Sequence, residues 1–201
     1  MLHKARSRVL SATAVAAMAV AGAASAAAPA SSPPATVSGT ALPSSDSGSA
    51  YAHRGRLVQG SQLGIRSFVN ARDGFSLASV GGAQYPASTT DGGRTWRVDG
   101  PHFHVNAANA PDVVTRTGVA GRSTYFAYAG PGGGQSVVVS RDAGRHWWRT
   151  YMPGVPLTVE PSAAGGRQPA LVAIVETNPG EFVAYLTTDG GRHWHIHHGF
   201  V

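Results

Sequence analysis

An eight-residue unit occurs three times in this sequence, at residues 89–96, 140–147 and 187–194. Its common form is Ser or Thr, any residue, Asp, Gly or Ala, Gly, Arg, Thr or His, and Trp. The closing tryptophans Trp96, Trp147 and Trp194 are 51 and then 47 residues apart. A period of this length suits one small four-stranded unit of β-sheet per copy. The repeat therefore predicts three similar units in tandem.

The residue types of the unit are those of a tight turn. An Asp side chain accepts backbone N–H bonds two residues on, and a Ser or Thr hydroxyl does so more weakly. The second glycine supplies the positive φ that a tight hairpin needs. The tryptophan then begins the returning strand and covers the sheet with a large apolar ring. These structural roles fall to Thr89, Asp91, Gly93, Trp96, Ser140, Asp142, Gly144, Trp147, Thr187, Asp189, Gly191 and Trp194.

The rest of the chain after residue 66 is typical of an all-β protein. Short runs rich in Val, Tyr, Phe, Thr and Trp alternate with Gly, Pro, Asn and Asp, and no stretch has helical periodicity. Strands are expected at residues 67–71, 75–80, 85–89, 95–98, 124–129, 136–140, 146–151, 170–175, 182–187 and 193–197.

Together the three units resemble the Asp-box, or BNR, repeat of the β-propeller superfamily that includes sialidases and photosystem II stability/assembly factor-like proteins. The resemblance covers about residues 66–201 and implies that each unit is the hairpin between the third and fourth strands of a blade. The expected fold is three tandem four-stranded antiparallel propeller-like blades after a signal peptide and a disordered linker. Closed propellers have about 4–8 blades, so three blades leave two uncovered ends. A homodimer or a protein partner would close them.

The N-terminal region is expected to lie outside this fold. Lys4, Arg6 and Arg8 precede an Ala-rich apolar run, and residues 24–26 offer a small-x-small cleavage pattern, so residues 1–26 are predicted to be a signal peptide. Residues 27–50 are mostly Ala, Pro, Ser, Thr and Gly and are predicted to be a disordered linker. The repeat domain is then residues 51–201, and the protein is expected to be secreted, with membrane contact only through an uncleaved signal peptide.

Charge and cysteine content exclude several classes of protein. Without residues 1–26 the chain has 13 arginines against 10 acidic residues, a formal net charge of +3. The arginines are scattered, whereas nucleic-acid binding shows as clustered basic residues, so no nucleic-acid partner is expected. The chain contains no cysteine, which excludes disulfides and thiolate zinc sites. No cofactor is predicted.

No catalytic residues are recognisable. A sialidase needs an arginine cluster, a Tyr nucleophile with a Glu partner and an Asp acid, and this set is not evident here. A two-carboxylate glycosidase would need two acids brought together in space. The carboxylates outside the units that could do so are Asp73, Asp99, Asp112 and Glu160. Enzyme activity is therefore uncertain, and the chain is expected to be non-catalytic.

Two weaker patterns could form a binding site. Arg94, Arg145 and Arg192 occupy the same position in the three units and could form a rim for a glycan or an acidic ligand, although a solubilising charge is the simpler interpretation. His193, His195 and His197 alternate on the last expected strand and share one face, as metal ligands can. A solvated histidine-rich strand explains them without a metal, so no metal site is predicted.

The leading functional hypothesis is a secreted, non-catalytic recognition or scaffold protein. Two alternatives remain open: a carbohydrate-active, sialidase-like glycoside hydrolase, and an assembly factor for an envelope complex. An enzyme needs two convergent carboxylates in a pocket, whereas a recognition module needs only a charged or aromatic-lined surface. The enzyme and recognition hypotheses therefore require different sites.

Overall fold

The computed structural model describes residues 32–43, 53–103, 115–165 and 169–198. The described residues from Pro33 onwards belong to one folded unit, to which this description is confined. The predicted signal peptide, residues 1–26, lies outside the described residues. The described part is all-β: it has antiparallel strands and two short 3-10 helices, and it has no helix long and apolar enough to cross a membrane.

The strands form three separate antiparallel sheets, none of which closes on itself. Sheet I contains β3 (Ser67–Phe68), β4 (Gly74–Val80), β5 (Ala83–Thr89) and β6 (Arg97–Val98). Sheet II contains β7 (Arg116–Ala120), β8 (Thr124–Tyr128), β9 (Ser136–Ser140), β10 (Trp148–Tyr151) and β2 (Thr40–Ala41). Sheet III contains β11 (Val155–Ser162), β12 (Ala170–Asn178), β13 (Glu181–Thr187), β14 (His193–Ile196) and β1 (Thr36–Ser38).

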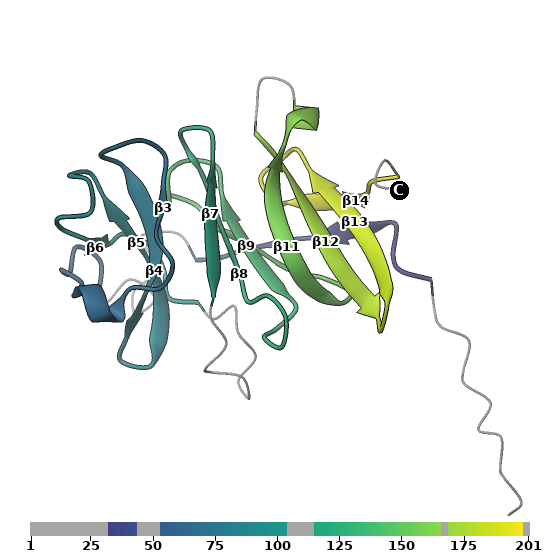
Figure 1. Cartoon of the computed structure of the whole chain (residues 1–201), viewed down its shortest axis with the longest axis horizontal. Coiled ribbons are helices and arrows are strands. Elements are labelled where there is room, and N and C mark those ends of the chain that lie inside the picture. Colours follow the sequence, from purple (N-terminus) through teal and green to yellow (C-terminus); the bar gives the residue numbers. More distant parts are fainter. Residues whose placement is uncertain (1–31, 44–52, 104–114, 166–168, 199–201) are drawn as a thin grey trace, which may run out of the picture. The chain divides into compact units, whose positions relative to one another are not determined.

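The sheets stack face to face in the order I, II, III (Figure 1). Each contains an up-and-down run of four consecutive strands, and the three eight-residue units, here called boxes 1, 2 and 3, each join the third strand of a run to its fourth. All-β architecture with consecutive antiparallel strands was expected and is confirmed. The expectation of four strands in every sheet is wrong for sheets II and III, which have five.

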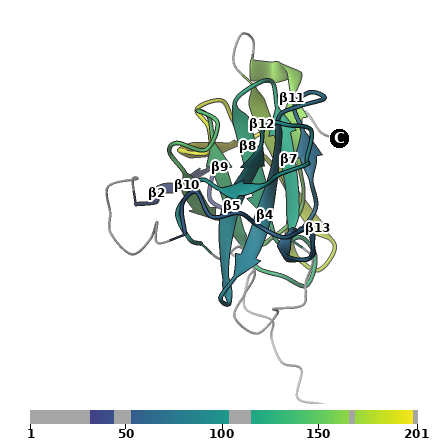
Figure 2. The same ribbon diagram turned by 90° about the vertical axis from the view of Figure 1, so that its left-hand side faces the viewer.

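The additional strands come from the segment predicted to be a disordered linker. Within residues 27–50, β1 pairs with β14, and β2 pairs with β10 (Figure 2). We call residues 36–42 the strap. Low apolar content predicted disorder, but Val37 packs against the core between sheets II and III, and Leu42 packs against the core between sheets I and II. The strap also satisfies backbone groups that two sheet edges would otherwise leave unpaired. The linker prediction is therefore wrong for residues 36–41.

Two more strands were not predicted, β7 and β11, and each breaks a sequence rule for a local reason. Strand β7 contains Gly118, a residue that weakens strands. The Phe126 ring occupies the space where a side chain at Gly118 would lie. Strand β11 contains Pro156 and Pro161, and it is tolerated because it is an edge strand, whose prolines need no partner on the open side.

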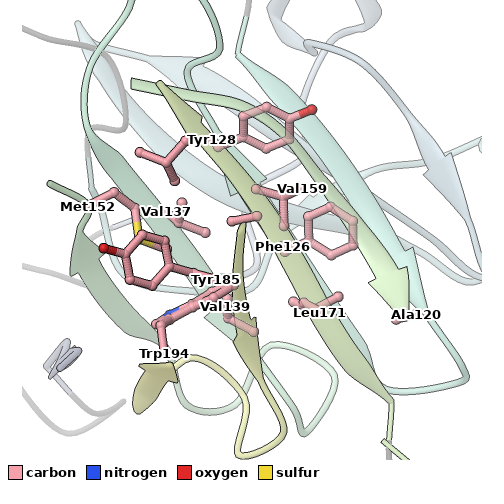
Figure 3. Packing of buried hydrophobic residues seen from close by; sticks show 12 residues of the cluster. Ala120, Phe126, Tyr128, Val137, Val139, Met152, Val159, Leu171, Tyr185 and Trp194 are labelled. Carbon is pink, nitrogen blue, oxygen red and sulfur yellow. The ribbon is translucent and has the colours of Figure 1, made fainter. Parts of the chain in front are cut away.

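The hydrophobic cores lie between the sheets. The core between sheets II and III is the largest (Figure 3) and is formed by Ala120, Phe126, Tyr128, Val137, Val139, Met152, Val159, Leu171, Ala173, Val175, Tyr185 and Trp194. A second core joins sheets I and II around Phe75, Phe103 and Trp147. The box tryptophans Trp96, Trp147 and Trp194 are 3%, 1% and 0% exposed, so their predicted burial is confirmed.

The two ends of the stack differ. The outer face of sheet I is covered by the chain itself, because Val58 and Leu63 pack on Trp96 and its neighbours. Isolated bridges from Leu57 to Arg97 and from Leu63 to Ala78 attach this covering segment, which includes the 3-10 helix η2 (Gly60–Gln62). The expectation of two uncovered ends is thus wrong for sheet I. At sheet III, the only described element beyond the strands is the 3-10 helix η3 (Ala163–Gly165), which contacts β12.

Candidate functional site

Each box is a closed hydrogen-bonded turn. In box 1 the Thr89 hydroxyl donates to Asp91 Oδ1 (2.8 Å) and accepts the Gly93 N–H (2.9 Å). The same Asp91 oxygen accepts the backbone N–H of Thr95 (2.9 Å). Boxes 2 and 3 repeat all three bonds with Ser140, Asp142, Gly144 and His146, and with Thr187, Asp189, Gly191 and His193.

These bonds fix the ionisation of the box aspartates. Hydrogen bonds from the side chain and backbone of Thr95 hold the pKa of Asp91 well below its usual range. Burial opposes ionisation of Asp142 and Asp189, but the bonds from His146 and His193 outweigh it and lower both pKa values. The box carboxylates are therefore charged acceptors held inside turns, and each turn already uses their oxygens.

The histidines on β14 do not converge on a metal position. The His193 imidazole lies 2.7 Å from Asp189 of its own turn, and that of His195 lies 3.1 Å from the Thr36 hydroxyl of the strap. Within the described ranges, no group of three His, Asp or Glu side chains could hold a metal ion. His197 follows the end of the strand.

The three box arginines do not form one rim site. Arg94, Arg145 and Arg192 are all exposed in their turns. Only Arg192 joins other functional side chains: its guanidinium lies over the Trp148 ring, 4.8 Å from the ring centroid. Among the described residues, no carboxylate lies within ion-pairing distance of Arg192.

A hollow of about 340 Å³ lies where box 2 meets box 3, and it is lined by Arg141, Asp142, His146, Trp148 and Arg192. Arg141 reaches across the junction so closely that a Cβ on Gly190 would collide with its Cγ and Cδ. His146 is held against Asp142, with 2.5 Å between Nδ1 and Oδ2. The hollow thus has two guanidinium groups, an indole and a histidine, and its one carboxylate is held in a turn.

The sequence signal that would have found this site is a departure from the repeat. The second position of the box is Thr90 in box 1 and Thr188 in box 3, but Arg141 in box 2. The position after the box tryptophan is Arg97 in box 1 and His195 in box 3, but Trp148 in box 2. Arg192 occupies a position that all three boxes share and was predicted as a candidate. Arg141 and Trp148 occupy positions that differ between the boxes and were missed.

The structure brings two of the carboxylates suggested for a glycosidase within electrostatic reach of one side chain. Asp73 and Asp99 both act electrostatically on Tyr125, which packs flat on Phe75 between sheets I and II. Glu160 lies on β11 of sheet III, and Asp112 lies outside the described residues. Of these acids, the three that the structure describes do not line the hollow.

Asp99 has the most perturbed carboxyl group of this set. Burial raises its pKa to about 6, although a hydrogen bond from Ser88 and the charge of Arg54 act in the opposite direction. Its carboxylate faces box 2, since a Cβ on Gly144 would lie 3.7 Å from both oxygens. The carboxyl is thus enclosed between sheet I and the turn of sheet II.

This raised pKa predicts an unusual pH dependence of stability. Because the folded chain holds the Asp99 proton more tightly than the unfolded chain, the contribution of Asp99 to the free energy of unfolding falls as pH rises from about 4 to about 6. We expect a loss of about 2–3 kcal/mol over that window. Asp99→Asn should remove most of the loss, as measured by urea denaturation at pH 4 and pH 7. If the free energy of unfolding changes equally between pH 4 and pH 7 in the variant and the wild type, Asp99 is not the group responsible.

Comparisons with protein families, with curated proteins and with solved structures returned no match to this chain. The fold itself defines the chain as an all-β protein of three stacked antiparallel sheets with open edges.

Proposed function

We propose that this chain is a secreted, non-catalytic recognition or scaffold protein of the Asp-box β-propeller kind, and that it binds an acidic ligand in the hollow between boxes 2 and 3. The observation that carries this proposal is the lining of the hollow by Arg141, Trp148 and Arg192. A hydrolase would need two convergent carboxylates, and the single carboxylate here, Asp142, is already held by Ser140 and His146.

The boxes favour the Asp-box comparison because of where they occur. Each is the turn between the third and fourth strands of a four-strand run, which is the position that the resemblance implies. The three sheets have four or five strands and none closes, so the described residues do not form a three-blade propeller. What supports the Asp-box comparison is the position of the boxes within the runs.

The chemistry of the hollow favours an anionic group. A guanidinium donates paired N–H bonds that match the two oxygens of a carboxylate. Stacking over Trp148 holds the Arg192 guanidinium in one place, which lowers the entropy lost when a ligand binds. Arg141 supplies the second charge from the neighbouring turn. Since the hollow is wide and open to solvent, it suits one residue of a longer acidic glycan.

Binding of polygalacturonate, with dextran as the neutral comparison, tests this function. We expect the full-length chain to bind the acidic polymer and not dextran, and Arg192→Ala to weaken binding at least about tenfold, since a hydrogen bond to a charged group contributes about 1.5–3 kcal/mol. Arg145→Ala is the matched control, because Arg145 has the same box position but does not line the hollow.

The same experiment separates the alternatives. Equal losses for Arg192→Ala and Arg145→Ala would show diffuse charge attraction rather than a site. Release of reducing ends from either polymer would favour the glycoside hydrolase. If the chain binds an acidic peptide and not the glycan, the ligand is a protein rather than a polysaccharide. That result would favour the scaffold or envelope-assembly role.

A further inference from the structure

The outer face of sheet III carries an ordered row of side chains across four strands. Glu160 on β11 pairs with Val172 on β12, Val172 with Leu186 on β13, and Leu186 with His195 on β14. The row thus runs from an acidic edge through two apolar residues to a histidine edge. These side chains point away from the core, because the alternate residues, such as Leu171, are the ones in it.

Neighbouring positions extend the apolar centre. Ile174 pairs with Ala184 beside the first row, and Phe182, at the far end of β13, pairs with Glu176. Ile174 and Leu186 are partly exposed and Phe182 is 57% exposed, whereas the smaller Val172 and Ala184 between them are 5% and 9% exposed. In the ranges that the structure describes, no strand packs over this face, whereas sheet I is covered by the segment around Val58 and Leu63 (Figure 1).

We propose that a second copy of this chain packs on the outer face of sheet III, related to the first by a two-fold axis parallel to the strands. That axis exchanges β11 with β14 and β12 with β13. Glu160 of each copy then faces His195 of the other, and the carboxylate can accept a hydrogen bond from the imidazole.

The alternative axis, perpendicular to the strands, is disfavoured by charge. It would place the Glu160 edge of one copy on the Glu160 edge of the other, and like charges in contact oppose association. The parallel axis also matches shape, because it sets Leu186 against Val172 and Ile174 against Ala184, a larger residue on a smaller one in each case. Two sheets with aligned strands pack in this way in β-sandwiches.

This dimer replaces the ring of six blades that an array with two open ends would form. Such a ring needs sheet III of one copy to pack on sheet I of the other. The covering segment already occupies the face of sheet I, where Val58 packs on the buried Trp96. Of the two outer faces that the described residues form, the face of sheet III is the one left for a symmetric contact, and a two-fold contact of one face with itself is closed.

The mass of the full-length chain in solution, measured by light scattering over a concentration series, tests the dimer. We expect twice the chain mass at micromolar concentration. Phe182→Asp should raise the dimer dissociation constant at least about tenfold, because the axis sets position 182 against Glu176 of the other copy and the substitution opposes two carboxylates. Leu57→Asp is the matched control, since Leu57 is 55% exposed on sheet I's side of the stack and should leave the mass unchanged.

A charge exchange identifies the axis. Glu160→Lys alone should weaken the dimer about tenfold, and Glu160→Lys combined with His195→Glu should restore it, because the two opposed charges are exchanged. A wild-type monomer at about 100 µM would overturn the proposal, as would a dimer insensitive to Phe182→Asp. Failure of the double variant to recover would overturn the parallel axis. Variants that remain folded by circular dichroism make each result interpretable.

Discussion

Replacing Trp147 by Ala should lower the free energy of unfolding by about 3–5 kcal/mol, the usual cost of truncating a large buried aromatic. The Trp147 indole packs between Phe75 and Phe103 at centroid distances of 5.5 and 5.4 Å, and its N–H donates to the Gly144 carbonyl at 2.9 Å. The substitution would therefore leave a cavity where sheets I and II meet and would also leave an acceptor in the box without its donor.

The neighbouring tryptophan supplies the control. Trp148 points to the other face of sheet II and lines the open hollow, so Trp148→Ala should cost much less, about 1 kcal/mol. Urea denaturation of both variants measures the difference. Similar losses for the two substitutions would mean that the strand phase assigned to β10 is wrong.

Gly39→Ala should detach the strap and lower the free energy of unfolding by about 2–3 kcal/mol, as expected when a side chain is forced into a filled space. Gly39 lies between β1 and β2, and its N–H donates to the Arg192 carbonyl at 2.8 Å. A Cβ there would collide with the Gly191 carbonyl and would lie 2.8 Å from the Thr150 hydroxyl. That hydroxyl also accepts the Trp194 indole N–H at 3.2 Å, so the disturbance should reach the core.

Hydrogen exchange measures whether Gly39→Ala detaches the strap. Amide protection should fall across the strap in Gly39→Ala and persist in β12, which lies farther from the collision. Thr40→Ala is the control, because Thr40 is exposed and its replacement adds no atoms to the contact. Unchanged protection of β1 and β2 in Gly39→Ala would show that the strap accommodates a side chain.

Local rules predicted the strands where residue type and position agreed. Runs such as residues 136–140 and 182–187 are rich in β-formers and became β9 and β13. These rules did not predict the strands of the strap, because its stability comes from partners that lie far along the chain. Thr36 pairs with His195, and Thr40 pairs with Arg149. No window of sequence contains both members of such a pair.

The candidate site was predictable only in part, for a related reason. The box chemistry located Arg192, because an identical position recurs in each copy. The hollow, however, depends on which copies are neighbours and on residues that differ between them, Arg141 and Trp148. The raised pKa of Asp99 was likewise not predictable, because the sequence does not distinguish a solvated aspartate from a buried one. Burial in the folded chain is what raises this pKa to about 6.

The strap also sets the order in which the molecule can be completed. Its partners are β10 and β14, and β14 ends at Ile196. The first described strand, β1, therefore cannot pair until the last one, β14, has been made. Pairings this distant in sequence slow folding, because a long loop must close before they form. In a growing chain β2 can pair once β10 has been made, but β1 must remain unpaired until synthesis has passed residue 196. That delay leaves β1 without its partner for longer than any strand of a local hairpin.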